Sequence, residues 1–493
     1  MTDLKTGDRS QESGVRSPTR DRSLDGRLAL SGMAEARLIR DGDLSASELV
    51  DAHLKRIEAV NPSLNAVAEV LEKSAREAAA RVDRQRARGE ELGPLAGVAF
   101  SIKDSIEVEG TVCTAGTLGL RDSAPSPRDA TLVARLRAAG AIPIARTNLP
   151  DLLFAFESDN LIRGRTNNPY DLSRTSGGSS GGEAALIAAC GSPFGLGSDA
   201  AGSVRLPAHF CGIASIKPTS GRMPRTGHVP GAGGWIETLW QIGPMARRVE
   251  DLCLLMPLLA APDGIDHTVI GMPCGDPGAV RLENLRVAFF TDNGIVPADS
   301  ETVSVVQRAA CAIDDEVKQI EERRPPGIEE SYDLEMRWIG PDGGDGLRAY
   351  LASIGSTRTH PLLEGWLQKL EPYRTTLVGF AEYWAALDRF RARMLAFFQD
   401  YDAILSPVCA HAALPHGAST EERTFRGFSY TMTYNLTGWP AAVVRCGQTA
   451  SGLPIGVQIA AHPWREDVAL RIAQRLEDGF GGWQPSPLAL LAG

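Results

Sequence analysis

The chain lacks any uninterrupted apolar run of about 18 residues, the length that a helix needs to cross a bilayer. It also lacks an excess of positive charge, because 61 acidic residues outnumber 51 basic ones and give a net charge of −10. Such a balance does not attract phosphate backbones or anionic lipid surfaces. We therefore expect no nucleic acid and no membrane as partners, and a soluble cytoplasmic protein.

Paired metal-binding or disulfide patterns are also missing. The eight cysteines are scattered, with no CxxC pair and no matching CxxH spacing, so they indicate neither a zinc site nor a disulfide framework. Residues 1–27 mix both charges with Ser, Gly and Pro and have no apolar core of a signal peptide. We expect a disordered tail there and a second short tail at 483–493.

Strand-like apolar runs alternate with helical ones along residues 28–482. This alternation predicts an α/β domain with a sheet covered by helices. A length of 493 residues fits either two or three average domains or one large α/β unit. The strands are expected at 98–102, 141–145, 285–290, 403–405, 441–444 and 455–459, and the last of them should rejoin the first sheet. The helices are expected at 132–139, 183–189, 249–259 and 466–476.

Two helices near the start carry local end signals. Ser45 and Glu48 form a capping box before an apolar helical pattern that should stop at Asn61-Pro62. A second helix over about 70–88 should end at Gly89. Between about 323 and 373 the periodicity is poor, and we expect an irregular insertion on the rim that serves as a lid or a binding loop.

Lys103 ends the apolar stretch Val98-Ala99-Phe100-Ser101-Ile102. It is either an exposed strand end or a buried base. If it is buried, desolvation lowers the pKa of its amine by several units from about 10.4 and allows it to accept a proton from a neighbouring hydroxyl.

Ser179 lies in the glycine cluster Gly177-Gly178-Ser179-Ser180-Gly181-Gly182, directly before a helical run. Glycines on both sides indicate a backbone bent into conformations that other residues disfavour. A phosphate-binding loop is disfavoured because the Lys-Ser/Thr ending is missing. The GxSxG pattern also fits a hydrolase elbow with Ser179 as nucleophile, and the histidines that its triad order offers downstream are His411, His416 and His462.

Ser203 ends the stretch Gly197-Ser198-Asp199-Ala200-Ala201-Gly202-Ser203 and should occupy a turn that feeds a short helix. Successive backbone N–H groups of Ala200, Ala201, Gly202 and Ser203 could converge on an oxyanion formed when Ser203 attacks a carbonyl. Lys103, Ser179 and Ser203 can together form a proton relay without histidine, which favours hydrolysis of a C–N bond.

Taken jointly, these stretches resemble the amidase signature family, and the resemblance runs from about Asp43 to Asp467. Further ordered matches are Thr147-Asn148, Asn168-Pro169, Ile216-Lys217-Pro218-Thr219, Gly221-Arg222, Gly243-Pro244-Met245, Val249-Glu250-Asp251, Ser406-Pro407, Asn435-Leu436-Thr437-Gly438-Trp439-Pro440 and Leu453-Pro454-Ile455-Gly456-Val457-Gln458.

The resemblance implies a mixed twisted sheet with helices on both faces, and roles for three residues. Ser203 would be the nucleophile, Ser179 the bridging serine after a cis peptide bond, and Lys103 the base. No metal or organic cofactor is implied. The family usually has two glycines before the nucleophile, whereas this chain has Ala201-Gly202, so we expect a negative φ at Ala201.

Residues 147–219 look most like fatty acid amide hydrolases, and this likeness would place Leu153, Phe154 and Phe156 in the wall of the acyl pocket. Ordinary core packing is the alternative for each of them. The preferred substrate is an apolar or aryl amide. A carbamate is close in chemistry, and urethane-cleaving members are a neighbouring group.

Two rival functions stay open. The chain could be the glutaminase subunit of a tRNA amidotransferase, which shares the same signature and works with a second protein chain. It could also be a catalytically silent binding protein that kept the fold. A homo-oligomer is compatible with the sequence, which does not determine the oligomeric state.

Overall fold

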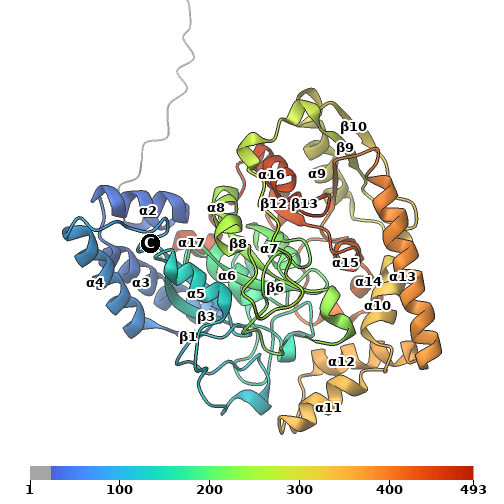
Figure 1. Ribbon diagram of the computed structural model, residues 1–493, viewed down its shortest axis with the longest axis horizontal. Coiled ribbons are helices and arrows are strands. Elements are labelled where there is room, and N and C mark those ends of the chain that lie inside the picture. The colour runs from blue at the N-terminus through green and yellow to red at the C-terminus, as the bar shows by residue number, and fades with distance from the viewer. Residues whose placement is uncertain (1–23, 232, 492–493) are drawn as a thin grey trace, which may run out of the picture.

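The computed structural model describes residues 24–231 and 233–491, and within them one eleven-stranded sheet organises the chain (Figure 1). The strand order is β1-β3-β2-β6-β8-β7-β12-β13-β11-β9-β10. The strands are β1 (Val67–Val70), β2 (Ala99–Lys103), β3 (Ile142–Thr147), β6 (Phe194–Asp199), β7 (Ala214–Lys217), β8 (Gln241–Ala246), β9 (Arg286–Phe289), β10 (Gln319–Glu322), β11 (Ala403–Pro407), β12 (Ala441–Gln448) and β13 (Pro454–Ala461). Two short strands, β4 (Asn167–Asn168) and β5 (Asp171–Thr175), pair with each other.

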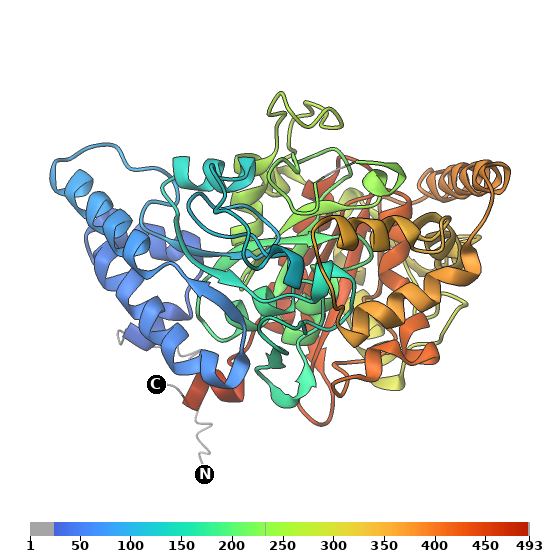
Figure 2. The ribbon, with the colours of Figure 1, turned by 90° about the horizontal axis from the view of Figure 1, so that it is seen from below.

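Helices flank the sheet, the N-terminal ones at one end and α10–α13 at the other (Figure 2). The α-helices are α1 (Leu24–Leu28), α2 (Gly32–Asp41), α3 (Ala46–Leu64), α4 (Glu72–Ala87), α5 (Thr131–Ala138), α6 (Gly181–Ala188), α7 (Arg205–Cys211), α8 (Val249–Leu259), α9 (Ser300–Cys311), α10 (Ser331–Ile339), α11 (Asp345–Ser353), α12 (Pro361–Leu370), α13 (Leu377–Phe397), α14 (Glu422–Arg426), α15 (Ser429–Leu436), α16 (Glu466–Phe480) and α17 (Pro487–Leu491). Among the described residues, every helix is too short or too polar to span a bilayer.

The sheet is mixed, and its parallel part positions the site. Strand β2 runs parallel to both β3 and β6, with Ile102 opposite Leu196, whereas β8 runs antiparallel to β6. Because parallel neighbours end at the same edge of a sheet, Lys103 at the end of β2 and Asp199 at the end of β6 lie at one edge. Loops that follow strand ends at such an edge are where α/β folds bind ligands.

The expected α/β architecture with a single mixed sheet is confirmed, and the late strands β11, β12 and β13 do join it. Helix α3 begins with the predicted capping box, in which Glu48 N donates to Ser45 Oγ at 3.1 Å. The predicted stop at Asn61-Pro62 is wrong, because the helix continues through Pro62 to Leu64. Pro62 gives up one intrahelical hydrogen bond. Asn65, in the left-handed conformation, ends the helix, and Asn61 Oδ1 accepts from Ala66 N at 2.8 Å just beyond it.

The prediction of an irregular segment over 323–373 is also wrong, since α10, α11 and α12 occupy most of it. These helices are short, and Gly340, Pro341, Gly343 and Gly344 separate α10 from α11, which breaks the periodicity. They do lie on the rim of the fold (Figure 1).

The structure describes only part of each predicted tail. Residues 1–23 of the predicted disordered tail lie outside the described part, and its last residues are helical, because Leu24–Leu28 forms α1. At the other end, Trp483 is buried and its indole N–H donates to Ala188 O at 3.1 Å. The segment from 483 to 491 is therefore packed on the domain, with α17 inside it.

Candidate active site

Lys103 is fully buried at the end of β2. Its Nζ lies within hydrogen-bond distance of Ser179 Oγ, at 2.7 Å, and of Ser198 Oγ, at 3.1 Å. Burial lowers the pKa of the amine to about 7, although the carboxylates of Asp199 and Glu183 raise it. The side chain is therefore a buried amine whose neutral form is populated near neutral pH, which excludes the exposed strand end.

Ser179 and Ser203 line the same cavity. The Gly178–Ser179 peptide bond is cis, as the family resemblance implies. Ser203 follows β6 and precedes helix α7, as predicted, and its carbonyl accepts from Ser180 N at 3.1 Å. The hydrogen bonds of the described residues include the link from Lys103 to Ser179 and do not include one from Ser179 to the Ser203 hydroxyl.

The turn that carries Ser203 is held by a buried ion pair. Arg205 donates to both carboxylate oxygens of Asp199, at 2.9 and 2.8 Å. The same carboxylate accepts from the N–H groups of Gly202 and Val204, at 2.8 and 3.2 Å. Arg205 keeps the pKa of Asp199 below its usual range. A charged, bidentate pair with these extra hydrogen bonds fixes the backbone around the serine.

The predicted oxyanion donors fall into two groups. The N–H groups of Ala200, Ala201 and Ser203 have no hydrogen-bond partner among the described residues. The N–H of Gly202 departs from the prediction, because it is taken by Asp199 and supports the turn. Gly202 has a φ of +121°, and a Cβ there would lie 2.3 Å from Thr431 Oγ1. Ala201 does not have a positive φ, which confirms the expectation for that position.

An apolar cavity of about 140 Å³ adjoins the two serines. The predicted pocket residues Leu153, Phe154 and Phe156 all line it, and Trp366 of α12 completes an aromatic wall. The ring centroids of Phe156 and Phe154 lie 5.5 and 5.9 Å from that of Trp366. The rim segment thus reaches the site, a contribution that the sequence did not assign to any residue.

The three histidines of the elbow alternative lie elsewhere. Each of them lies within hydrogen-bond distance of a backbone carbonyl, which belongs to Ala412 for His411, to Leu172 for His416 and to Phe398 for His462. None of the three lines the cavity. The histidine that does line it is His228, which the sequence did not single out. A single histidine between glycine and valine gives no spacing signal that would have linked it to Lys103.

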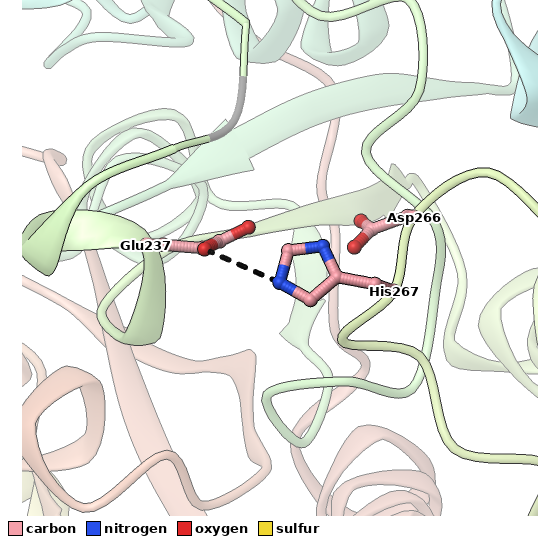
Figure 3. A group of neighbouring side chains, drawn as sticks. All are labelled: Glu237, Asp266 and His267. Atoms are coloured by element: carbon pink, nitrogen blue, oxygen red, sulfur yellow. Dashed lines mark ion pairs between the residues drawn. The ribbon is translucent and has the colours of Figure 1, made fainter.

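Glu237, Asp266 and His267 form the group of potential metal ligands that the described residues contain (Figure 3). Arg225 already pairs with Glu237 at 2.8 Å and with Asp266 at 3.0 Å, while His267 Nε2 is 4.0 Å from Glu237. Because the guanidinium forms ion pairs with both carboxylates, this group is explained as a structural ion-pair network.

An α/β sheet that brings a buried amine, two serines and free backbone N–H groups to one apolar cavity is the arrangement of a hydrolase that attacks a carbonyl carbon. Residues 48–470 match the amidase family. The chain is 33% identical to an acylamidase of Rhodococcus erythropolis, covering 91% of this chain and 95% of that protein. It is 31% identical to fatty-acid amide hydrolase 2 of Homo sapiens, covering 92% and 90%.

A glutamyl-tRNA(Gln) amidotransferase subunit from Thermus thermophilus is similarly related, with 34% identity over 88% of this chain and 93% of that protein. A solved structure of 6-aminohexanoate cyclic dimer hydrolase with its substrate superimposes with a TM-score of 0.83 and 26% identity, covering 94% of this chain and 99% of that one. The chain belongs to the amidase signature family, and it is a hydrolase of amide C–N bonds.

Proposed function

We propose that the chain cleaves compact apolar or aryl amides through an acyl-enzyme on Ser203, with Ser179 and Lys103 as the proton relay. The observation that carries this proposal is the 2.7 Å contact between Lys103 Nζ and Ser179 Oγ at a cavity that Ser203 also lines. The missing contact between the two serines is compatible with it, because catalytic hydrogen bonds are often long without substrate and tighten in the complex.

The proton path follows from the donors and acceptors present. Neutral Lys103 takes the proton of Ser179, which takes the proton of Ser203 as its Oγ bonds to the carbonyl carbon. The oxyanion is received by the free N–H groups of Ala200, Ala201 and Ser203. Ser179 then gives a proton to the leaving nitrogen, the C–N bond breaks, and an ester on Ser203 remains. Water attacks this ester, and the acid product leaves.

The cavity favours a compact acyl group. Its volume of about 140 Å³ is close to the roughly 150 Å³ of an engineered apolar cavity that holds one benzene molecule. The aromatic wall of Phe154, Phe156 and Trp366 suits a flat ring, since offset and edge-on ring pairs are favourable. An aryl carbamate fits the same reasoning, because its carbonyl is also linked to nitrogen.

The glutaminase alternative draws support from the 34% identity to the amidotransferase protein of Thermus thermophilus. Glutamine, however, carries an ammonium and a carboxylate that need charged or strongly polar partners. The cavity lining contains one charged side chain, Asp199, and that carboxylate is committed to Arg205. The lining therefore supports an apolar substrate over glutamine.

The test has two parts. First, the purified chain is treated with a fluorophosphonate and the labelled serine is located by mass spectrometry; we expect Ser203, whereas label on Ser179 would contradict the assigned roles. Second, anilides, fatty amides, aryl carbamates and glutamine are compared as substrates. We expect aryl or short-chain anilides to give the highest kcat/KM, and turnover of glutamine alone would establish the glutaminase.

A further inference from the structure

His228 is a buried polar side chain of the cavity that the proposed relay does not use. It is 6% exposed, and its ring lies 4.5 Å from that of Trp240, centroid to centroid. Its Nδ1 lies 3.0 Å from Pro230 O, and its Nε2 lies 3.0 Å from Ser198 Oγ and 3.1 Å from Ser105 Oγ. Both ring nitrogens are thus engaged with protein groups.

These contacts fix the tautomer of His228. A carbonyl oxygen can only accept, so Nδ1 carries the hydrogen and donates it to Pro230. Burial, together with the positive charge of nearby basic groups, lowers the pKa of the imidazole to about 3, so the ring is neutral. Its Nε2 is therefore an acceptor with one lone pair, which the hydroxyls of Ser198 and Ser105 share at 3.0 and 3.1 Å, with Ser198 the nearer donor.

The direction of the next hydrogen bond follows from this. Once the hydroxyl hydrogen of Ser198 points to His228, its oxygen offers lone pairs to Lys103, whose Nζ donates to it at 3.1 Å. A second N–H of the amine faces Ser198 O at 3.5 Å. A neutral amine has two hydrogens and one lone pair, so both hydrogens are then used on Ser198.

We propose that His228 is a positioning residue that acts through Ser198 to aim the lone pair of neutral Lys103 at the hydroxyl of Ser179. This inference rests on the proposed relay and adds to it the contact that orients the lone pair of Lys103. Without the acceptor at position 228, the Ser198 hydroxyl turns and donates to the lysine lone pair. That state competes with proton transfer from Ser179.

Two substitutions distinguish the role of Nε2, the acceptor for Ser198, from that of Nδ1. In His228→Gln, the amide oxygen can replace Nε2 as acceptor for Ser198. In His228→Asn, the shorter amide stays near Nδ1 and leaves Ser198 without its acceptor. We expect His228→Asn to lower kcat for an anilide and the rate of fluorophosphonate labelling by about tenfold, which corresponds to ~1.4 kcal/mol, with KM changed less than about threefold. His228→Gln should retain most of both rates.

A double-mutant cycle tests whether His228 acts through Ser198. Ser198→Ala should lower both rates by a similar factor, and adding His228→Asn should lower them little further. Ser215→Ala is the matched control, because Ser215 is also a buried strand serine and its hydroxyl has no partner within the described part of the chain. Thermal unfolding of every variant shows which of them are folded.

The outcomes are distinct. Equal losses for the Gln and Asn variants, multiplying losses in the double variant, or a rise in KM with unchanged kcat would each overturn the role of His228. If folded Asn and Gln variants both react as fast as the parent protein, the inference is also wrong while the relay stands. If the parent protein itself shows no labelling of Ser203, it is the proposed function that fails.

Discussion

Replacing Lys103 by methionine should abolish amide hydrolysis and at the same time stabilise the fold. Methionine has a similar length and carries no charge into the fully buried site that the amine occupies. Burial that lowers the pKa of a lysine also lowers the free energy of unfolding, because the folded protein disfavours the charged form. The size of this effect can be worked out from the position of the pKa.

The pKa of Lys103 falls from 10.5 to about 7 on folding, chiefly through burial. With ~1.36 kcal/mol for each pH unit, the penalty is at most about 5 kcal/mol. Between pH 7 and 10.5 the unfolded chain binds a proton that the folded one does not, so the stability of the parent protein rises with pH. The penalty is complete below the folded pKa and disappears above the unfolded one.

The difference in unfolding free energy between Lys103→Met and the parent protein reports chiefly on this group, because titrations that do not depend on Lys103 cancel. Glu183 is the exception, since the ammonium lowers the pKa of its carboxyl. Equilibrium urea unfolding at about pH 7, 8 and 9 should show the variant more stable, with the advantage shrinking by ~1.4 kcal/mol for each pH unit. A difference that does not change with pH would mean that the titration of Lys103 does not affect the stability of the fold. Lys217→Met is the matched control, since Lys217 is equally buried with a pKa of about 7. It should show the same stability trend with hydrolysis retained.

Three further predictions concern the reaction. Ser203→Ala should abolish turnover, and Lys103→Ala should lower kcat severely, more for amides than for esters. The loss of kcat in Ser179→Ala should lie between these two. Steady-state kinetics with a matched anilide and ester checks this order. The pH profile of kcat/KM should have an acid limb with a midpoint near 7, falling about tenfold for each pH unit below it as Lys103 becomes charged. Trp366→Ala should raise kcat/KM for bulky acyl anilides relative to benzoyl ones in a competition assay, and an unchanged ratio would remove Trp366 from the acyl pocket.

Local signals predicted well those elements that are fixed by their own residues. The capping box of Ser45 and Glu48, the αL glycine at position 89 and the apolar run before Lys103 each specify a backbone state within a few residues. Strand β6 was missed because Gly195 and Gly197 interrupt its pattern. A Cβ at Gly195 would lie 1.8 Å from Glu183 Oε1, so the glycine is set by a contact distant in sequence.

The candidate site also combines residues that local sequence predicts with contacts that only the folded chain forms. Lys103, Ser179 and Ser203 stand in short stretches whose composition already indicates a buried strand end and two glycine turns. The contacts of Asp199 with Asn435 and of Arg205 with Gln458 join segments more than 200 residues apart, and no local pattern reports them. The same holds for Trp366, whose helix packs over the cavity from the rim.

A lysine near two carboxylates would ordinarily stay charged, and the structure indicates why Lys103 need not. Arg205 binds Asp199 through both oxygens, so much of that negative charge is already compensated. Glu183 accepts from the hydroxyls of Ser101 and Thr147 and has no cationic partner in direct contact among the described residues, and burial raises its pKa to about 7. Near neutral pH, neither carboxylate therefore stabilises the ammonium form strongly.

Glu183 nevertheless carries a charge that can be removed by substitution and that raises the pKa of Lys103, so it tests the position of the acid limb. Glu183→Gln keeps the shape and the hydroxyl partners but removes the charge that raises the pKa of Lys103, so the midpoint of the kcat/KM profile should move to lower pH. Glu477→Gln is the matched control, because burial raises the pKa of that carboxyl to about 7 as well, and it lies on α16 away from the cavity. A midpoint that stays in place or moves upward in Glu183→Gln would mean that the carboxylate does not raise the pKa of Lys103.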